Sequence, residues 1–416
     1  MNEIFHSVEL IEEKCNGCTR CMIKCPVEAI RLKNSKAVIY GDRCIDCGVC
    51  IKVCPYNAHV GKRDVLDVLD NFKTKIAIPS VTLYSQFGEY IEPGLINDAI
   101  KSLGFDEVFD ITYACDIVTE ITKNEIEKMP KPAISPFCPS IIRLIQVNYP
   151  ELVDHIVKVL TPIEVAAILI REKYGENSDG IGIFYLSPCV SRVTKGKYPF
   201  LSSETHIDGV LAISDLFPQL LKYINKNKAA APQSNSNMSS TGIAWAIPGG
   251  QSKAMNLEEY IAVYGVENVI KVLDEIEKGK LSNVDFVEAF ACTEGCLGGI
   301  LLADNPFNAR RIINKYYDKL DKRCEINEMS EEYKSRFLSD MKNNKTYNPK
   351  LAEDFASAVK KMNFMNKLIN SLPGTDCGQC GSPSCKAFAE DVVRGLSTVD
   401  ECKFITLKGG EGNEGK

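Results

Sequence analysis

Eighteen cysteines are the residues of this 416-residue chain most able to do chemistry. The first thirty residues lack the charged start and apolar centre of a signal peptide, so we expect a cytoplasmic protein. Thiols stay reduced there, and clustered cysteines then indicate metal ligands rather than disulfides. Only four histidines are present, none of them paired at zinc-ligand spacing. The sequence therefore predicts thiolate metal chemistry, which iron–sulfur clusters and zinc both use.

Two copies of one cysteine pattern, Cys-x2-Cys-x2-Cys-x3-Cys-Pro, lie within residues 1–65. The short spacers allow three thiolates to close around one face of a cubane, and the following x3-Cys-Pro projects its thiol toward the other cluster. The repeat resembles the bacterial two-cluster ferredoxins, which implies an electron relay. We predict a first [4Fe–4S] cluster on Cys15, Cys18, Cys21 and Cys54 and a second on Cys44, Cys47, Cys50 and Cys25. Zinc is the alternative, and two matched copies that each end in Cys-Pro weigh against it.

A different spacing places the last four cysteines, Cys377, Cys380, Cys385 and Cys402, within residues 360–405. The segment reads Asp-Cys-Gly-Gln-Cys-Gly, then a cysteine that opens a helix expected over residues 386–394, then a distant cysteine. It resembles the small four-cysteine [4Fe–4S] domain of electron-transfer and corrinoid-linked proteins from anaerobes. The resemblance implies one further [4Fe–4S] cluster, with zinc as the competing interpretation.

Four more cysteines, Cys138, Cys189, Cys292 and Cys296, each lie in a short patterned segment. Residues 135–139 read Ser-Pro-Phe-Cys-Pro and resemble the T-S-C-C-P motif of the [FeFe] hydrogenases, and residues 147–152 resemble their Y-Y-P-E-L. Residues 186–192, Leu-Ser-Pro-Cys-Val-Ser-Arg, resemble the family's x-M-P-C-x-x-K. Residues 288–299 resemble its E-x-M-x-C-x-x-G-C-x-x-G-G. The order and separation of these segments also suit the family.

The resemblance implies an H-cluster. In the family four thiolates hold a [4Fe–4S] cubane, and one of them bridges to a diiron unit bearing CO, cyanide and a bridging dithiolate. Carried over by position, Cys138, Cys189 and Cys292 are cubane ligands, and Cys296 is the bridging one. Pro188, Gly298 and Gly299 then belong to the cofactor pocket, where glycine lets the backbone approach closely. For each cysteine taken alone, a buried small hydrophobe or a zinc ligand is the alternative.

Four positions depart from the family's motifs. Phe137 stands where the family has its proton-delivering cysteine, and a phenyl ring cannot transfer a proton. Ser187 and Phe290 stand where the second and third motifs have methionine. Arg192 aligns with the lysine that donates to a diiron cyanide, and its bulkier fork fits a pocket differently. Changes around a metal site commonly cost about 10–100-fold in activity, so the departures imply slow turnover.

Three further residues have open roles. Cys115 falls near a stretch that lines the diiron site in the family, so it is either a replacement proton-relay thiol or a plain buried cysteine. Glu120 is a candidate onward carboxylate for the same relay. Cys324 lies in a charged region and is expected to be an unliganded thiol.

The elements around these cysteines must bring them together. Apolar runs predict strands at residues 75–81, 107–112, 182–186, 210–214 and 286–291, and helices at 93–103, 140–148, 161–173, 216–225 and 308–320. This alternation predicts parallel sheets covered by helices, with sites at the strand ends. We expect a multidomain α/β protein with a ferredoxin-like α+β domain (1–65), a two-lobed α/β domain (70–345) and a small helical Fe–S domain (360–405). Residues 229–241 are predicted as a surface loop and residues 342–349 as a linker.

The composition argues against two classes of protein, those that bind nucleic acid and those that span a membrane. A net charge of −6 without a basic block argues against nucleic acid, and no apolar run reaches the ~20 residues of a membrane span. Three functions stay open. The first is a hydrogenase that interconverts H2 with protons and electrons, with a ferredoxin or other redox protein as partner. The second is an H2 sensor with a separate signalling partner. The third is an electron carrier or scaffold without the diiron unit, which in the first two must be installed by maturation proteins.

Overall fold

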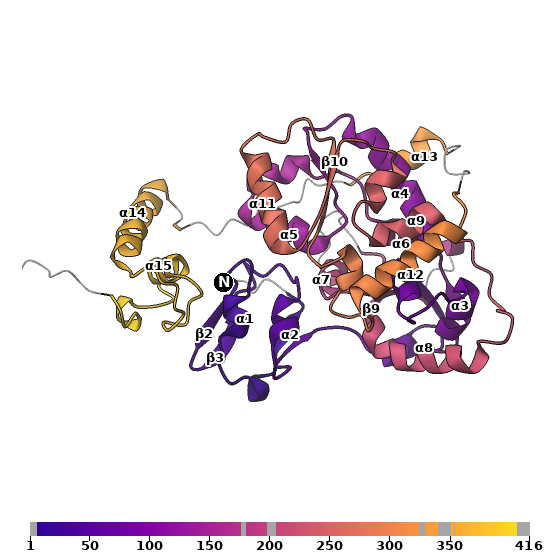
Figure 1. The fold of residues 1–416 in the computed structure, drawn as a ribbon, viewed down its shortest axis with the longest axis horizontal. Coiled ribbons are helices and arrows are strands. Elements are labelled where there is room, and N and C mark those ends of the chain that lie inside the picture. The colour runs from indigo at the N-terminus through magenta and orange to yellow at the C-terminus, as the bar shows by residue number, and fades with distance from the viewer. Residues whose placement is uncertain are drawn as a thin grey trace, which may run out of the picture.

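The structure is a computed structural model that describes residues 6–175, 180–197, 205–323, 329–339, 351–352 and 354–405. Figure 1 shows the described elements in a row. The C-terminal helices α14 (Phe355–Ser371) and α15 (Cys385–Val393), in yellow, lie beside the indigo N-terminal elements, and a larger central group lies on the other side of these. The expected fold class is confirmed, because helices surround parallel sheets in the central group.

The larger central sheet has four parallel strands. Their order is β6 (Glu107–Val108), β5 (Thr74–Pro79), β8 (Ile181–Ser187) and β9 (Gly209–Ala212). All seven residues of β8 are buried, and such a continuous apolar run is typical of a parallel strand covered on both faces. The helices of this lobe include α3 (Pro93–Lys101), α4 (Ile111–Ile126), α6 (Pro162–Tyr174) and α8 (Ile213–Asn227). α3 packs on α8, and α4 packs on α6.

A smaller parallel sheet forms the second lobe. Its strands are β10 (Tyr260–Tyr264), β11 (Phe286–Phe290) and β7 (Ala133–Ile134), in that order. Helices α5 (Pro139–Asn148) and α11 (Val266–Glu277) pack on β11 and share one apolar cluster with it. The other central helices are α7 (Ser191–Lys197), α9 (Ser240–Ile243), α10 (Gly250–Ala254), α12 (Pro306–Lys319) and α13 (Glu331–Ser335).

Short elements make up the N-terminal group. β1 (Val8–Leu10) pairs with β4 (His59–Gly61), and β2 (Ile30–Lys33) pairs with β3 (Lys36–Ile39), both antiparallel. Two single-turn helices, α1 (Arg20–Ile23) and α2 (Val49–Val53), lie within the two cysteine runs and contain Cys21 and Cys50. Their buried apolar residues form a small cluster that also includes Val190 and Leu301 of the central group. The N-terminal group therefore packs on the central one.

The expected elements differ from the observed ones in a few places. The strand expected at 107–112 is wrong beyond Val108, because Asp110 caps α4 there and accepts a hydrogen bond from the Thr112 N–H at 3.0 Å. β10 and α11 were not expected. The loop at 229–241 is exposed at first, but it ends buried at Met238 and Ser239 and leads into α9. The linker at 342–349 and Cys324 lie outside the described residues.

Among the described residues, no helix is both long enough and apolar enough to cross a membrane.

Candidate metal centre

Four separated cysteines meet where the carboxyl ends of strands from both central sheets converge. Cys138 caps α5 shortly after β7, and Cys189 follows β8 directly after Pro188. Cys292 follows β11, and Cys296 lies in the 3-10 turn Gly295–Gly298. All four side chains line one cavity of about 20 Å³. The two-lobed fold thus brings together thiols that are up to 158 positions apart (296 − 138) in the sequence.

Burial governs the protonation of these thiols. It raises the pKa of Cys138, although the N–H groups of Ala291 and Ile141 act against it. Burial also raises the pKa of Cys292 and Cys296, and the neighbouring thiol of Cys189 raises both further. Thiols with raised pKa values are protonated near neutral pH. A metal that binds here must therefore displace protons, as thiolate ligation generally does.

Arg192 forms one wall of the cysteine cavity. Its guanidinium lies 4.6 Å from the centre of the Phe137 ring, and its Nη2 donates to the Phe137 carbonyl at 2.5 Å. Its Nη1 is buried and has no hydrogen-bond partner among the described residues. A buried unpaired cationic donor is costly, so this atom indicates a place for an acceptor that the protein itself does not supply.

Phe137 and Phe290 form an aromatic group beside the cavity. The Phe137 ring meets Trp245 edge-on at 5.2 Å and Phe290 at 6.3 Å between ring centres. Phe290 lines the cavity, whereas Phe137 does not. The Ser187 hydroxyl donates to the Cys189 carbonyl at 2.8 Å, so it shapes the turn that presents Cys189.

The two glycines after Cys296 serve backbone contacts. A Cβ on Gly299 would come within 2.3 Å of the Pro188 carbonyl oxygen, so the absence of a side chain lets the two loops touch. A Cβ on Gly298 would come within 2.1 Å of the Thr293 carbonyl oxygen, inside its own turn. Pro188 and Gly299 line the cavity, and Gly298 does not.

Cys115 and Glu120 lie apart from the cavity lining. Cys115 is 2% exposed in the core of the first lobe, and burial raises its pKa well above the ordinary value. Glu120 is half-buried and five residues further along α4, which places it about 140° around the helix from Cys115. The two side chains therefore do not share a helix face.

The N-terminal cysteines gather into two groups. Cys15, Cys18, Cys21 and Cys54 line one cavity of about 10 Å³. Burial is the largest cause of the raised pKa values of Cys47 and Cys50. The neighbouring thiol of Cys25 raises both further, and Cys47 also raises the pKa of Cys50. This second group reaches the central site, because Cys47 and Asp46 also line the central cavity. The C-terminal cysteines Cys377, Cys380, Cys385 and Cys402 line a separate cavity of about 10 Å³.

Comparisons with known proteins identify the family. The sequence model for the iron only hydrogenase large subunit, C-terminal domain, matches residues 73–259 and 250–300, which is more than half of the chain. The chain belongs to the iron-only, or [FeFe], hydrogenase family. A 4Fe-4S dicluster domain matches residues 7–55, and a putative Fe-S cluster domain matches residues 372–404.

The relatives within the family are distant. The NADP-reducing hydrogenase subunit of Solidesulfovibrio fructosivorans is 22% identical over 324 residues, which cover 62% of this chain and 55% of that protein. The large subunit of the periplasmic [Fe] hydrogenase of Nitratidesulfovibrio vulgaris is 24% identical over 364 residues, which cover 71% of this chain and 86% of that protein. The chain thus spans about half the length of the first relative.

A solved structure shares the fold. The structure that reveals stepwise [FeFe]-hydrogenase H-cluster assembly matches with a TM-score of 0.50 and 15% identity, over 66% of this chain and 96% of that chain. At this identity the likeness concerns the fold alone.

The residues present fit the cofactors of an [FeFe] hydrogenase. Five cysteines line the central cavity, namely the four separated ones and Cys47 of the second N-terminal group, and among the described lining residues only Asp46 offers a carboxylate or imidazole ligand. Such a donor set suits an iron–sulfur cubane. Arg192 also lines this cavity and carries an Nη1 without a hydrogen-bond partner among the described residues, so it is a candidate donor to an anionic ligand on the diiron unit.

Sequence reasoning missed two features around the site, the hydrogen bonds of Asp46 and a second cavity. Asp46 accepts hydrogen bonds from the Ser7 N–H at 2.9 Å and from the Thr194 hydroxyl at 2.6 Å, so it joins the N-terminal group to α7. An aspartate between two cysteine ligands of a ferredoxin pattern is the only sequence signal for this contact, and it does not name the partner.

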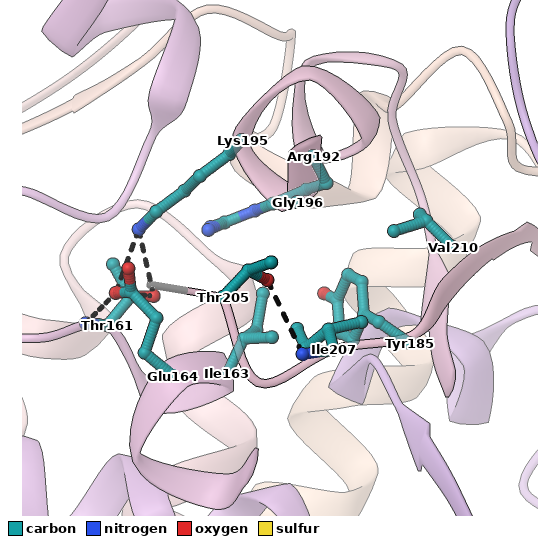
Figure 2. A pocket seen from close by; sticks show the side chains of 10 residues that line it. All are labelled: Thr161, Ile163, Glu164, Tyr185, Arg192, Lys195, Gly196, Thr205, Ile207 and Val210. Carbon is teal, nitrogen blue, oxygen red and sulfur yellow. Dashed lines mark hydrogen bonds and ion pairs between the residues drawn. The ribbon is translucent and has the colours of Figure 1, made fainter. Parts of the chain in front are cut away.

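The second missed feature is a separate cavity of about 30 Å³ that Arg192 also lines, enough for about two water molecules. Figure 2 shows the Arg192 guanidinium pointing toward Lys195 and Glu164. The Lys195 Nζ lies 2.9 Å from Glu164, and burial lowers the pKa of Lys195 to about 8. Burial opposes ionisation of Glu164, but Lys195 and Thr161 together hold its pKa below the ordinary value. Arg192 thus lines both this cavity and the cysteine cavity.

Proposed function

We propose that the chain is an [FeFe]-hydrogenase-type oxidoreductase that interconverts H2 with protons and electrons at an H-cluster. In this proposal Cys138, Cys189, Cys292 and Cys296 hold the cubane, and Cys296 also bridges to the diiron unit. The observation that carries the proposal is the meeting of these four thiols in one cavity that Arg192 also lines. The diiron unit, when bound, would supply the chemistry that activates H2.

The protein's own residues would orient and isolate the cofactor. Arg192, which lines the cysteine cavity, is the residue that we propose to donate to an anionic ligand of the cofactor, and Phe137 contacts its guanidinium. Phe137 packs edge-on against Trp245 and Phe290, and of these three rings only Phe290 lines the cavity. This apolar group carries no proton, and Phe137 stands where the family has its relay cysteine. This arrangement supports slow turnover, which suits either a slow enzyme or an H2 sensor with a separate signalling partner.

Electrons would reach the site through the N-terminal clusters. Cys47, proposed as a ligand of the second N-terminal cluster, lines the central cavity itself. The redox partner would be a ferredoxin or a similar one-electron carrier, and maturation proteins would install the diiron unit. We retain the domain boundaries 1–65, 70–345 and 360–405 and a cytoplasmic location as parts of this proposal.

An infrared spectrum of anaerobically matured protein tests the proposal. Sharp CO and cyanide bands that change under H2 are expected. Arg192→Met should shift the cyanide bands if Arg192 donates to that ligand, and Phe307→Leu, at an exposed position on α12, serves as the control that leaves them unchanged.

A second outcome favours a different function. If iron analysis and EPR find cubanes but the infrared bands are missing, the chain acts as an electron carrier or scaffold without the diiron unit. The contacts of Phe137 with Trp245 and Phe290 would then serve only the packing of the core.

A further inference from the structure

The C-terminal cysteine site is fixed to the N-terminal group through three consecutive residues of β2. Arg31 forms an ion pair with Asp391, and neither side chain is exposed to solvent. The Leu32 N–H donates to the Gly381 carbonyl at 2.8 Å. Lys33 donates to the Leu396 carbonyl at 3.0 Å and to the Ser397 hydroxyl at 2.9 Å.

Only a thin layer separates this site from the first N-terminal site. Leu32 lines the cavity of Cys15, Cys18, Cys21 and Cys54, and it bonds directly to Gly381, the residue after Cys380. A Cβ on Gly381 would come within 2.3 Å of the Leu32 carbonyl oxygen. On Gly378, which follows Cys377, a Cβ would meet the methyl group of Met22, the neighbour of Cys21, at 3.0 Å. Two glycines thus allow the C-terminal site to approach the first site closely.

Further contacts connect the first N-terminal site to the second, and the second to the central cavity. Cys21 of the first group, on α1, and Cys50 of the second, on α2, belong to one buried cluster, and the two helices pack on each other. Cys47 of the second group lines the central cavity with Cys292. Figure 1 shows the same order, with the yellow C-terminal elements beside β2 and β3 and the central group beyond α2.

We propose that the C-terminal site is the outer end of a single line of four iron–sulfur sites, where a small one-electron carrier protein exchanges electrons with the chain. The proposal rests on the iron–sulfur content of the proposed function but not on the diiron unit. One electron would leave the reduced carrier and enter the cluster held by Cys377, Cys380, Cys385 and Cys402, and the first and second N-terminal sites would relay it to the central site. The carrier is oxidised by one electron, and no bond or proton is involved.

The surface around the C-terminal site suits such an exchange. Cys377 is exposed, and Phe404, which lines the same cavity, is 50% exposed. Aromatic side chains are enriched at protein–protein interfaces, so the exposed Phe404 beside the site is suited to contact a carrier protein. Cys18 of the first site is exposed as well, so direct transfer there is the competing route.

Stopped-flow reduction of the full chain separates the two routes. The clusters are reduced by a bacterial two-[4Fe–4S] ferredoxin or by methyl viologen radical, and their visible absorption is followed. In Cys385→Ser, which should lose one cluster by iron analysis, we expect reduction of the other clusters by ferredoxin to slow by about tenfold or more, because the carrier must dock on one patch. Reduction by methyl viologen, which needs no docking patch, should change less than about twofold.

A matched pair of variants keeps the clusters in place. Phe404→Glu should slow reduction by ferredoxin at unchanged iron content, and Phe307→Glu, at a 61% exposed position on α12, should not. These variants decide the question if Cys385→Ser fails to fold. Wild-type rates with ferredoxin in Phe404→Glu, or in a Cys385→Ser protein that has lost a cluster, would place electron entry at Cys18 and overturn the proposal. A Cys385→Ser protein with its full iron content would overturn it too. None of these readouts depends on the infrared test of the diiron unit.

Discussion

At the scale of single residues, the departures at Phe137 and Arg192 form one contact. The Arg192 guanidinium lies over the Phe137 ring and donates to the carbonyl of the same residue. The Phe137 ring stands where the family has a cysteine thiol, and the Arg192 guanidinium stands where it has a lysine ammonium. The two side chains contact each other, so each supports the other. Returning one position alone to the family's residue would leave its neighbour without support.

The first prediction measures this coupling. Phe137→Leu and Arg192→Met should show an interaction energy of about 1–2 kcal/mol in a double-mutant cycle, since a desolvated cation–π contact has about that strength. The free energy of unfolding is followed anaerobically by fluorescence of Trp245, the single tryptophan. The control pair Phe307→Leu and Arg192→Met should be additive within about 0.5 kcal/mol. Additivity of the first pair would mean that the two departures are independent.

The second prediction concerns Gly299. Gly299→Ala brings a Cβ against the Pro188 carbonyl and forces apart the loops that present Cys189 and Cys296. We expect the variant to lose the central cubane and about four iron atoms per chain, while the two other cluster regions keep theirs. Gly196→Ala in α7, where the nearest atom is 3.3 Å away on Val210, is the control and should keep all its iron. Full iron in Gly299→Ala would show that the loops can separate without cost.

The third prediction concerns the thiol of Cys115. It is buried in the first lobe and does not line the cavity, so Cys115→Ala should leave the pH profile of H2 activity unchanged. The variant should lose only about 1 kcal/mol of stability, because it removes one buried sulfur. A displaced pH profile would return Cys115 to the proton route.

At the scale of elements, the start of α6 holds a buried charge pair. Thr161 and Glu164 form a capping box at the N-terminus of this helix, and Lys195 reaches over from α7 to Glu164. Lys195→Met would leave the Glu164 carboxylate buried without its cation, which costs about 3–5 kcal/mol at pH 7. Adding Glu164→Gln, which removes the charge, should recover most of this loss.

The pH dependence of that loss has a definite sign. In the wild type the depressed pKa of Glu164 stabilises the fold above pH 4.5, the ordinary value, and this contribution disappears as the pH falls below it. In Lys195→Met, burial raises the pKa of Glu164 and the hydrogen bonds of Thr161 oppose it without help from Lys195, so the carboxyl takes up a proton at a higher pH than in the wild type. The stability gap between wild type and variant should therefore be widest near pH 7 and shrink toward pH 5, as measured by urea unfolding. A constant gap would mean that Glu164 does not titrate in this range.

Much of the fold could be predicted from local patterns, and contacts between distant segments could not. β8 and α6 match their expected ranges closely, because an apolar run and a Thr-Pro helix start are visible in the sequence. The start of α4 was missed since Ile111 and Thr112 are β-branched and favour a strand, whereas the Asp110 cap decides for a helix. The cysteine groups were predicted from motif spacing, but the partner of Asp46 and the lining of two cavities by Arg192 depend on how the lobes pack.

At the scale of the whole molecule, the Arg31–Asp391 pair joins residues 360 positions apart. Asp391→Asn would leave the Arg31 charge buried and unpaired, which should weaken docking of the C-terminal elements by about 3–5 kcal/mol. Hydrogen exchange at the Leu32 amide, which bonds to Gly381, should speed up accordingly. Asp215→Asn breaks the partly exposed pair with Arg63 and should change stability by about 0–1 kcal/mol. Unchanged exchange at Leu32 would mean that the other contacts of β2 suffice for docking.

The contact of Asp46 with Thr194 also bears on how the protein is made. Asp46 and Cys47 close one side of the central cavity, yet they are synthesised well before α7 and the segments that carry Cys189, Cys292 and Cys296. During translation the early segment is thus already available when the later wall folds against it. We expect insertion of the N-terminal clusters to precede closure of the central cavity. A central lobe produced without its first 65 residues would emerge with an open side and with its inner thiols exposed to the solvent.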